Sequence, residues 1–307
     1  MTTPASLDAS NLTEDQAAAS EGFWRATLRR LLKHPVGRIG VIIILILVIM
    51  AAFGSILSPY DPNAIDFENR FAPPSLAHPF GTDDFGRDTF SRVLYGARIS
   101  LLVGVIAVSI AGTLGTFLGL LAGYTARRWV DEVIMRAMDI LFAFPAILLA
   151  IAILAALGKG IANAMIAIGL VYTPIFARIA RGAVLSVRNE EYVTAARALG
   201  TRNSVIVLRH ILPNSLAPLI VETSLSLAFA ILAEAALSFF GLGTPPPDPS
   251  WGRMLSEGRA YFQQSIWMAL FPGLAIMFSV MGFNFLGDGL RDALDPKMRQ
   301  MLEMRGR

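Results

Sequence analysis

The sequence has no cysteine and few charged residues, and both shortages narrow what the chain can be. Without cysteine it has no disulfide framework, no thiolate metal site and no cysteine nucleophile. Only 16% of its residues are charged, against about 25% in a typical soluble protein. Apolar residues take their place, and the mean hydropathy reaches +0.57. These values exclude an ordinary soluble enzyme, a disordered chain and a collagen-like chain.

Two functional motifs are also missing. A nucleotide-binding P-loop ends in Gly-Lys-Ser/Thr, but the single Gly-Lys pair of this sequence, Gly158-Lys159, is followed by Gly160. The three histidines are far apart and show no metal-ligand spacing. A net charge of +3 gives no support for nucleic-acid binding. We therefore predict no catalytic residue, no metal site and no cofactor on this chain.

Six apolar stretches approach or exceed the roughly 20 residues that cross a bilayer. They run from Ile39 to Leu57, Ile99 to Gly123, about Val133 to Leu157, Ile161 to Ala177, Asn214 to Phe240 and Ile266 to Leu286. The first is longer than the apolar region of a signal peptide and has no convincing cleavage site after it. The sequence therefore predicts an all-α polytopic membrane protein with six transmembrane helices, the first of them uncleaved.

The distribution of positive charge predicts the orientation. If the N-terminus is cytoplasmic, 19 of the 26 Lys and Arg residues lie on the cytoplasmic side, which favours a cytoplasmic N-terminus and C-terminus. The predicted parts are a disordered N-terminus (1–24), the first helix with its preceding segment (25–58), an extracytoplasmic loop (59–98), a core of five helices (99–290) and a cytoplasmic tail (291–307). The core includes an inner loop at about 188–213 and an outer loop at 241–265.

The extracytoplasmic loop contains an acidic cluster, Asp83, Asp84 and Asp88, in the sequence GTDDFGRD. We interpret it as a turn with a helix cap and nearby arginine counter-charges, with a cation site as the alternative. Residues 87–98 could form a short amphipathic helix on the membrane surface.

Two carboxylates, Glu222 and Glu234, lie inside the fifth apolar stretch. A carboxylate in a membrane is costly unless it is paired or faces water. At about 100° per residue, their spacing places them on different faces of one helix. Each could pair with a polar group on a neighbouring helix or line a transport pathway.

The inner loop reads RNEEYVTAARALGTRNSVIVLRHILPNSLAPLI from Arg188 to Ile220. Asn189 is predicted to cap a helix whose first turn holds Glu190 and Glu191. Ala195 and Ala196 would give this helix a smooth surface that another protein can approach closely.

The second half of the loop contains typical helix boundaries. Gly200 is predicted to end the first helix, Thr201 or Asn203 to begin a second, and Pro213 suits the start of the next span. The product is a charged helix–turn–helix at the cytoplasmic surface, with a plain solvated hairpin as the alternative.

This loop resembles the cytoplasmic coupling loop of importer-type ABC permeases. That pattern is EAA, three residues, Gly, nine residues and I-x-L-P. The residues that match it are Ala195, Ala196, Gly200, Leu212 and Pro213. Two positions depart, because Thr194 replaces a frequent Glu and His210 replaces a frequent Ile.

Three longer segments resemble the C-type subunit of the dipeptide, oligopeptide and nickel permease family. They are GTDDFGRDTFSRVLYGARISL (81–101), FFGLGTPPPDPSWGRMLSEGR (239–259) and GDGLRDALDP (287–296). The resemblance extends over about residues 25–300. It implies a type I ABC importer permease fold in the bacterial inner membrane and one half of a translocation pathway. The implied partners are a second, B-type permease, two ATPase subunits that hold ATP and Mg²⁺, and an extracytoplasmic binding protein.

The resemblance also implies roles for particular residues. The loop from Glu191 and Tyr192 to Pro213 would dock on an ATPase subunit, and Asp83, Asp84 and Trp251 would contact the binding protein. Peptides are the expected substrates, with glutathione or a nickel chelate as alternatives. An ion-coupled secondary transporter, with the two intramembrane carboxylates at its ion site, is the alternative from another class.

Overall fold

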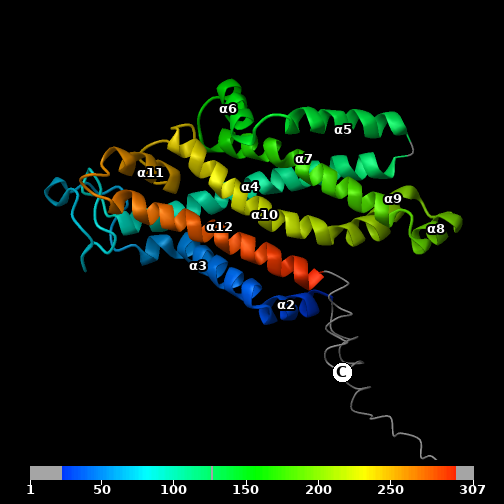
Figure 1. Ribbon diagram of the computed structural model, residues 1–307, viewed down its shortest axis with the longest axis horizontal. Coiled ribbons are helices and arrows are strands. Elements are labelled where there is room, and N and C mark those ends of the chain that lie inside the picture. The colour runs from blue at the N-terminus through cyan, green and yellow to red at the C-terminus, as the bar shows by residue number, and fades with distance from the viewer. Residues whose placement is uncertain (1–22, 126, 295–307) are drawn as a thin grey trace, which may run out of the picture.

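The computed structural model describes residues 23–125 and 127–294, and in these residues it is helical without any strand. The predictions for residues 1–22 and 295–307 lie outside the described residues. Five helices are long and apolar enough to cross a membrane: α3 (Pro35–Leu57), α4 (Thr89–Tyr124), α7 (Ile161–Val187), α10 (Leu212–Phe239) and α12 (Trp267–Leu294). They run side by side along the long axis of the molecule (Figure 1).

The third predicted span is not one continuous helix. It is divided into α5 (Arg128–Phe142) and α6 (Ala146–Leu157), which meet at an angle of 96° and make a sixth span only if the pair is counted as one. Pro145 occupies the N-cap position of α6. Proline lacks an N–H and pushes the residue before it out of the helical region, which accounts for the break.

The fourth predicted span is longer than the sequence indicated. α7 continues through Pro174 and ends at Val187, ten residues beyond the predicted end. It packs closely against α4, where a Cβ atom on Gly119 would lie only 2.4 Å from the Ala177 carbonyl oxygen. Small residues allow two helices to approach in this way within a membrane. The main apolar core lies around this contact, with α6 and α10 completing it.

Short helices and loops occupy the two ends of the bundle. α8 (Glu191–Ala198) and α9 (Asn203–Val205) lie at the right in Figure 1 and α2 (Phe23–Lys33) lies below the middle, whereas the 58–88 loop and α11 (Trp251–Ala260) lie at the left. The 58–88 loop includes a short 3₁₀ turn, η1 (Phe67–Asn69). We call the end with α8 cytoplasmic, because the positive charge of the sequence is concentrated there.

The expected surface helix at residues 87–98 is instead the first part of a spanning helix. α4 begins at Thr89 and continues without a break to Tyr124. The Asp88 carboxylate caps it by accepting a hydrogen bond of 2.7 Å from the Ser91 backbone N–H. This confirms the interpretation of the acidic cluster as a turn with a helix cap.

Candidate functional site

A small apolar cluster attaches the inner loop to the bundle. Val193 is the buried residue of α8, and it packs with Val184 of α7 and with Ile206 and Ile211 of the following segment. All four side chains have 0% exposure. The cluster therefore joins α8 to α7 and to the segment that leads into α10.

Much of the rest of α8 is exposed, although the Tyr192 ring lies 6.3 Å from the ring of His210. Glu191, Tyr192 and Ala195 are exposed, and Leu199 just after the helix is 85% exposed. Ala196 is half-buried beside the apolar cluster. The loop therefore presents a helix with acidic, aromatic and small residues to the cytoplasmic side, as a docking element requires.

The helix ends as predicted but begins differently. Gly200 has a φ of +75°, and the Thr201 and Gly200 N–H groups donate to the Ala196 and Arg197 carbonyls, which is the Schellman arrangement. The predicted cap at Asn189 is wrong. Glu190 is the N-cap residue, while the Asn189 side chain donates back to the Leu185 carbonyl at the end of α7.

The second part of the loop is a continuous helical run into the next span. The short α9 is followed by a π-helical segment, η2 (Ile206–Ile211), and then by α10, with Pro213 in its first turn. The Pro213 ring would conflict with the carbonyl of Arg209 in a regular α-helix. The wider π-helical turn just before it relieves this conflict.

At the other end of the molecule, buried charges connect the 58–88 loop to the bundle. Arg87 Nε lies 2.6 Å from Asp83 Oδ2, and Arg87 Nη2 lies 3.5 Å from Glu257 of α11. Arg92, which is 1% exposed, lies within 3.7 Å of the same two carboxylates and donates to the Pro62 carbonyl. Partial burial and the charge of Asp83 raise the pKa of Asp84.

The predicted contact of Trp251 with a binding protein is wrong for the indole ring. Trp251 is 0% exposed, and its Nε1–H donates to the Val93 carbonyl at 2.9 Å. The ring fits there because it lies beside Gly96, where a Cβ atom would approach it to 2.7 Å. Asp83 is also buried, so its carboxylate serves the ion pairs of the loop.

The two intramembrane carboxylates have different surroundings. Glu234 is 1% exposed and accepts hydrogen bonds from Ser100 of α4 and Ser238 of its own helix. It thus has the predicted polar partner on a neighbouring helix, and it does not line an open surface of this subunit. Glu222 is half-buried and accepts a hydrogen bond from Ser226.

Sequence reasoning missed a charged surface between α5 and α7. Asp131 receives two hydrogen bonds from Arg181, at 2.5 and 2.6 Å, and Asp139 pairs with Arg178 at 2.7 Å. These residues line an open pocket of about 570 Å³. Their spacing was visible, since Asp131 and Asp139 are eight residues apart, but their partners lay just beyond the predicted end of the fourth span.

Within residues 23–125 and 127–294, no three His, Cys, Asp or Glu side chains are grouped to hold a metal ion. The arrangement is that of a membrane subunit whose short helix α8, at the cytoplasmic end, exposes most of its residues. A chain of the MetNI methionine ABC transporter, in an inward-facing conformation, has the same fold. Its TM-score is 0.56 at 17% identity, over 66% of this chain and 97% of that chain.

The chain belongs to the family of binding-protein-dependent transport system inner membrane components, whose model matches residues 115–300. The model of the N-terminal transmembrane domain of oligopeptide transport permease C matches residues 22–74. These matches confirm the predicted permease family and its all-α membrane fold. They also remove the ion-coupled secondary transporter from consideration.

Several curated relatives are similar over nearly their whole length. The dipeptide transport system permease protein DppC of Alkalihalophilus pseudofirmus is 51% identical over 286 residues, which is 93% of each chain. The probable D,D-dipeptide transport system permease protein DdpC of Escherichia coli is 48% identical, over 83% of this chain and 86% of that protein. The glutathione transport system permease protein GsiD of Pectobacterium atrosepticum is 45% identical, over 90% and 92%.

Proposed function

We propose that this chain forms half of the translocation pathway of an ATP-driven peptide importer in a bacterial inner membrane. Two ATPase subunits hold and hydrolyse ATP with Mg²⁺, a second, B-type permease completes the pathway, and an extracytoplasmic protein delivers the substrate. This chain carries out no covalent chemistry. The observation that carries the proposal is α8, whose exposed surface projects from the bundle while Val193 anchors its other side.

In this mechanism, α8 occupies a groove on an ATPase subunit. Closure of the two ATPase subunits on ATP moves α8, and the apolar cluster transmits the movement to α7 and α10. The pathway then opens alternately to the two sides of the membrane. The coupling residues are those predicted from the sequence: Glu191, Tyr192, Ala195, Ala196 and Gly200, with Leu212 and Pro213 at the start of α10.

The charged surface between α5 and α7 is the best candidate for the polar lining of the pathway. Charged side chains in membrane helices face either a partner or water, and Asp139 and Arg178 remain 63% and 40% exposed while paired. Glu222 remains a further candidate, because it is only half-buried. A cysteine at Asp139 should react with a water-soluble maleimide in the assembled importer, whereas one at the buried Met138 should react far more slowly.

Peptides are the substrate class that the relatives share in their names, because dipeptides, D,D-dipeptides and glutathione all contain amide-linked amino acids. Glutathione is the second candidate, supported by the relatives named for it. Uptake of a labelled dipeptide, measured with and without excess glutathione, separates the two. Contacts with the binding protein are expected from exposed parts of the 58–88 loop, such as Phe67 and Leu76, with Asp84 at their edge.

The decisive experiment is ATP-driven peptide uptake into vesicles that contain the assembled importer. Deletion of residues 195–200 should abolish uptake, and Ala195→Arg should reduce it at least tenfold, because either change spoils the surface of α8. Both variants should still insert into the membrane. Arg128→Ala, at a side chain that is 92% exposed on α5, is the matched control and should transport normally. Normal uptake by the deletion variant would overturn the coupling role.

A further inference from the structure

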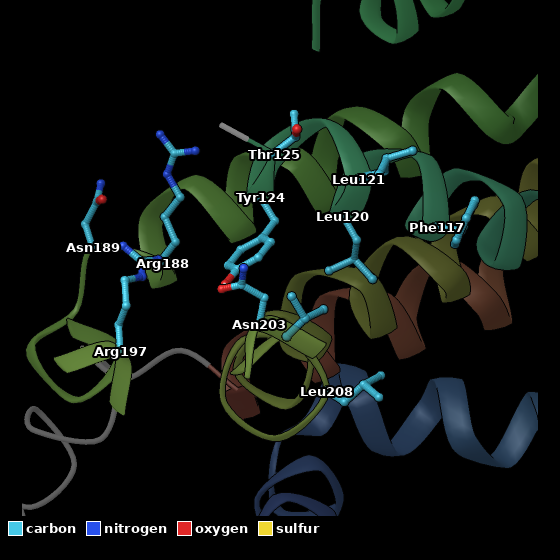
Figure 2. Close-up of a pocket in the computed structure, with 11 residues that line it drawn as sticks. Phe117, Leu120, Leu121, Tyr124, Thr125, Arg188, Asn189, Arg197, Asn203 and Leu208 are labelled. Carbon is cyan, nitrogen blue, oxygen red and sulfur yellow. The ribbon is translucent and has the colours of Figure 1, made fainter. Parts of the chain in front are cut away.

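A pocket of about 910 Å³ opens at the cytoplasmic end of the bundle. It lies between the last turns of α4, the end of α7 and the inner loop (Figure 2). Its size is at the upper end of the range for pockets that hold small molecules. The charged surface between α5 and α7 does not use this space, whereas Leu120 and Tyr124 both line it and pack against the cluster that anchors α8.

The lining of the pocket changes from apolar to basic along its length. Phe117, Leu121 and Leu208 form one end and are 63%, 45% and 62% exposed. Arg188 and Arg197 form the other end, as Figure 2 shows. Such a gradient matches a molecule with a hydrocarbon part and a charged head, rather than a uniformly polar or apolar ligand.

Polar groups occupy the boundary between the two ends. The Tyr124 hydroxyl donates to Asn203 Oδ1 at 2.7 Å, which joins α4 to α9 in the middle of the pocket. Phe117 lies seven residues before Tyr124 on α4, a distance of about 10 Å at 1.5 Å per residue. Tyrosine is typical of the membrane–water interface, so the apolar end reaches into the hydrocarbon layer and the basic end lies at the headgroups.

The basic end has little counter-charge, because Asp131, a carboxylate near Arg188, is already paired with Arg181. No Asp or Glu lines the pocket. Arg197 is exposed and makes no ion pair in the described part of the chain. Arg188 Nη1 donates to the Gly123 carbonyl at 2.7 Å, and its guanidinium keeps further N–H donors for an anion.

We propose that this pocket binds an anionic phospholipid of the inner leaflet. Its acyl chains lie along Phe117, Leu121 and Leu208, and its phosphate accepts hydrogen bonds from Arg188 and Arg197. Basic pockets between membrane helices on the cytoplasmic side are suited to anionic headgroups. A free phosphate would leave the apolar end uncovered, whereas a phospholipid covers both ends.

The position of the pocket gives the lipid a regulatory role. Arg197 belongs to α8, while Arg188 caps the end of α7. A phosphate held by both residues bridges the ATPase-docking helix and the bundle beside the apolar cluster. Anionic lipid therefore stabilises the attachment of α8, and transport depends on the lipid composition of the inner leaflet.

The test measures lipid retention by the assembled importer with native mass spectrometry, in detergent with added phosphatidylglycerol or phosphatidylcholine. Phosphatidylglycerol should be retained on this chain and phosphatidylcholine should not. Arg197→Gln should weaken retention about fivefold, the effect of one basic residue near an anionic headgroup. Arg202→Gln, which removes the same charge from the same loop outside the pocket, should have little effect.

Two further measurements distinguish the occupants. Inorganic phosphate should not displace the lipid; if it does, the pocket is a simple phosphate site. The sequence has no cysteine, so a photo-crosslinker attached to the Leu208→Cys variant marks one position. It should label lipid. Labelling of a protein subunit would show that a partner fills the pocket. Displacement by phosphate or labelling of a protein subunit would overturn the proposal. Equal retention of both lipids, or an equal loss of retention in the Arg202→Gln variant, would also overturn it. None of these readouts depends on which substrate the importer carries.

Discussion

At the outer end of the molecule, buried charges connect the 58–88 loop to α4 and α11, whereas at the inner end a cluster of apolar side chains holds α8. Arg92 and Asp83 contact groups from several segments at once. Val193 instead packs within a cluster of four fully buried apolar residues. Ion pairs with fixed geometry resist sliding, because each displaced charge is left buried and unpaired. An apolar cluster has no directional bonds and tolerates small shifts.

This difference fits the proposed roles of the two ends. The outer loop acts as a fixed surface, and α8 acts as a short helix that moves with its ATPase and carries the bundle with it. Variants at each end test this difference, and the largest effect is expected at the outer end.

Replacement of Arg92 by leucine should destabilise the folded chain by about 3 kcal/mol, since removal of one partner leaves the carboxylates buried without it. Arg87 still contacts Asp83 and Glu257, which keeps the loss at the low end of the usual range. Thermal unfolding of the detergent-purified chain, followed by size-exclusion chromatography, measures it. Arg253→Gln, at a side chain that is 25% exposed, is the control and should cost less than about 1 kcal/mol. Equal effects would refute the outer-end account.

Val193→Ala should weaken the attachment of α8 by about 2 kcal/mol, from the lost methyl groups and the small cavity that remains. The bundle itself should unfold at nearly the same temperature, because α8 lies outside its main core. Peptide uptake per ATP hydrolysed should therefore fall sharply. Val133→Ala, the same change at a side chain that is 60% exposed on α5, should keep the wild-type ratio. An unchanged ratio in Val193→Ala would separate the cluster from coupling.

Gly200→Ala should cost about 1–2 kcal/mol, because its φ of +75° is unfavourable for a residue with a Cβ atom. Gly182→Ala is the matched control, since neither glycine has atoms within 4 Å of an added Cβ. Gly182 lies within α7 with helical backbone, so alanine there should stabilise by up to about 1 kcal/mol. Limited proteolysis of the inner loop reports both changes, and similar cleavage rates in the two variants would contradict the assigned turn.

Asp84→Asn should have the smallest effect. Partial burial and the Asp83 charge raise the pKa of the Asp84 carboxyl, so ionisation of this group disfavours the folded state. The variant should be more stable than the wild type at neutral pH, by less than about 1 kcal/mol, because solvent screens the exposed part. The difference should vanish at a pH below the ordinary carboxyl pKa of about 3.9. A gain that persists at low pH would exclude a titration effect.

Local sequence patterns predicted much of the fold. The apolar stretches located the spans, and glycine at position 200 located the end of α8. Local patterns gave the wrong structure where contacts with a segment distant in the sequence determine it. Residues 87–98 looked amphipathic because of their arginines, yet Arg92 is covered by the Pro62 carbonyl and by Glu257 of α11, and the segment belongs to a spanning helix.

The site was predictable to a similar extent. The inner loop has a contiguous motif, and its proposed coupling role comes from the resemblance of that motif to a permease family. The charged surface between α5 and α7 could not, because Asp139 meets Arg178 only after the chain bends at Pro145. Trp251 looked like a surface contact within a proline-rich loop, and only the space beside Gly96 places its ring inside.

The most direct test of the account places a benzophenone photo-crosslinker on a cysteine at Ala195 in the assembled importer. The chain has no native cysteine, so the label marks one position on this subunit. The account predicts a covalent adduct between α8 and an ATPase subunit, and none from a label at Lys159 at the outer end. Adducts only with lipid or with a permease subunit would contradict the central claim that α8 is the ATPase-docking helix.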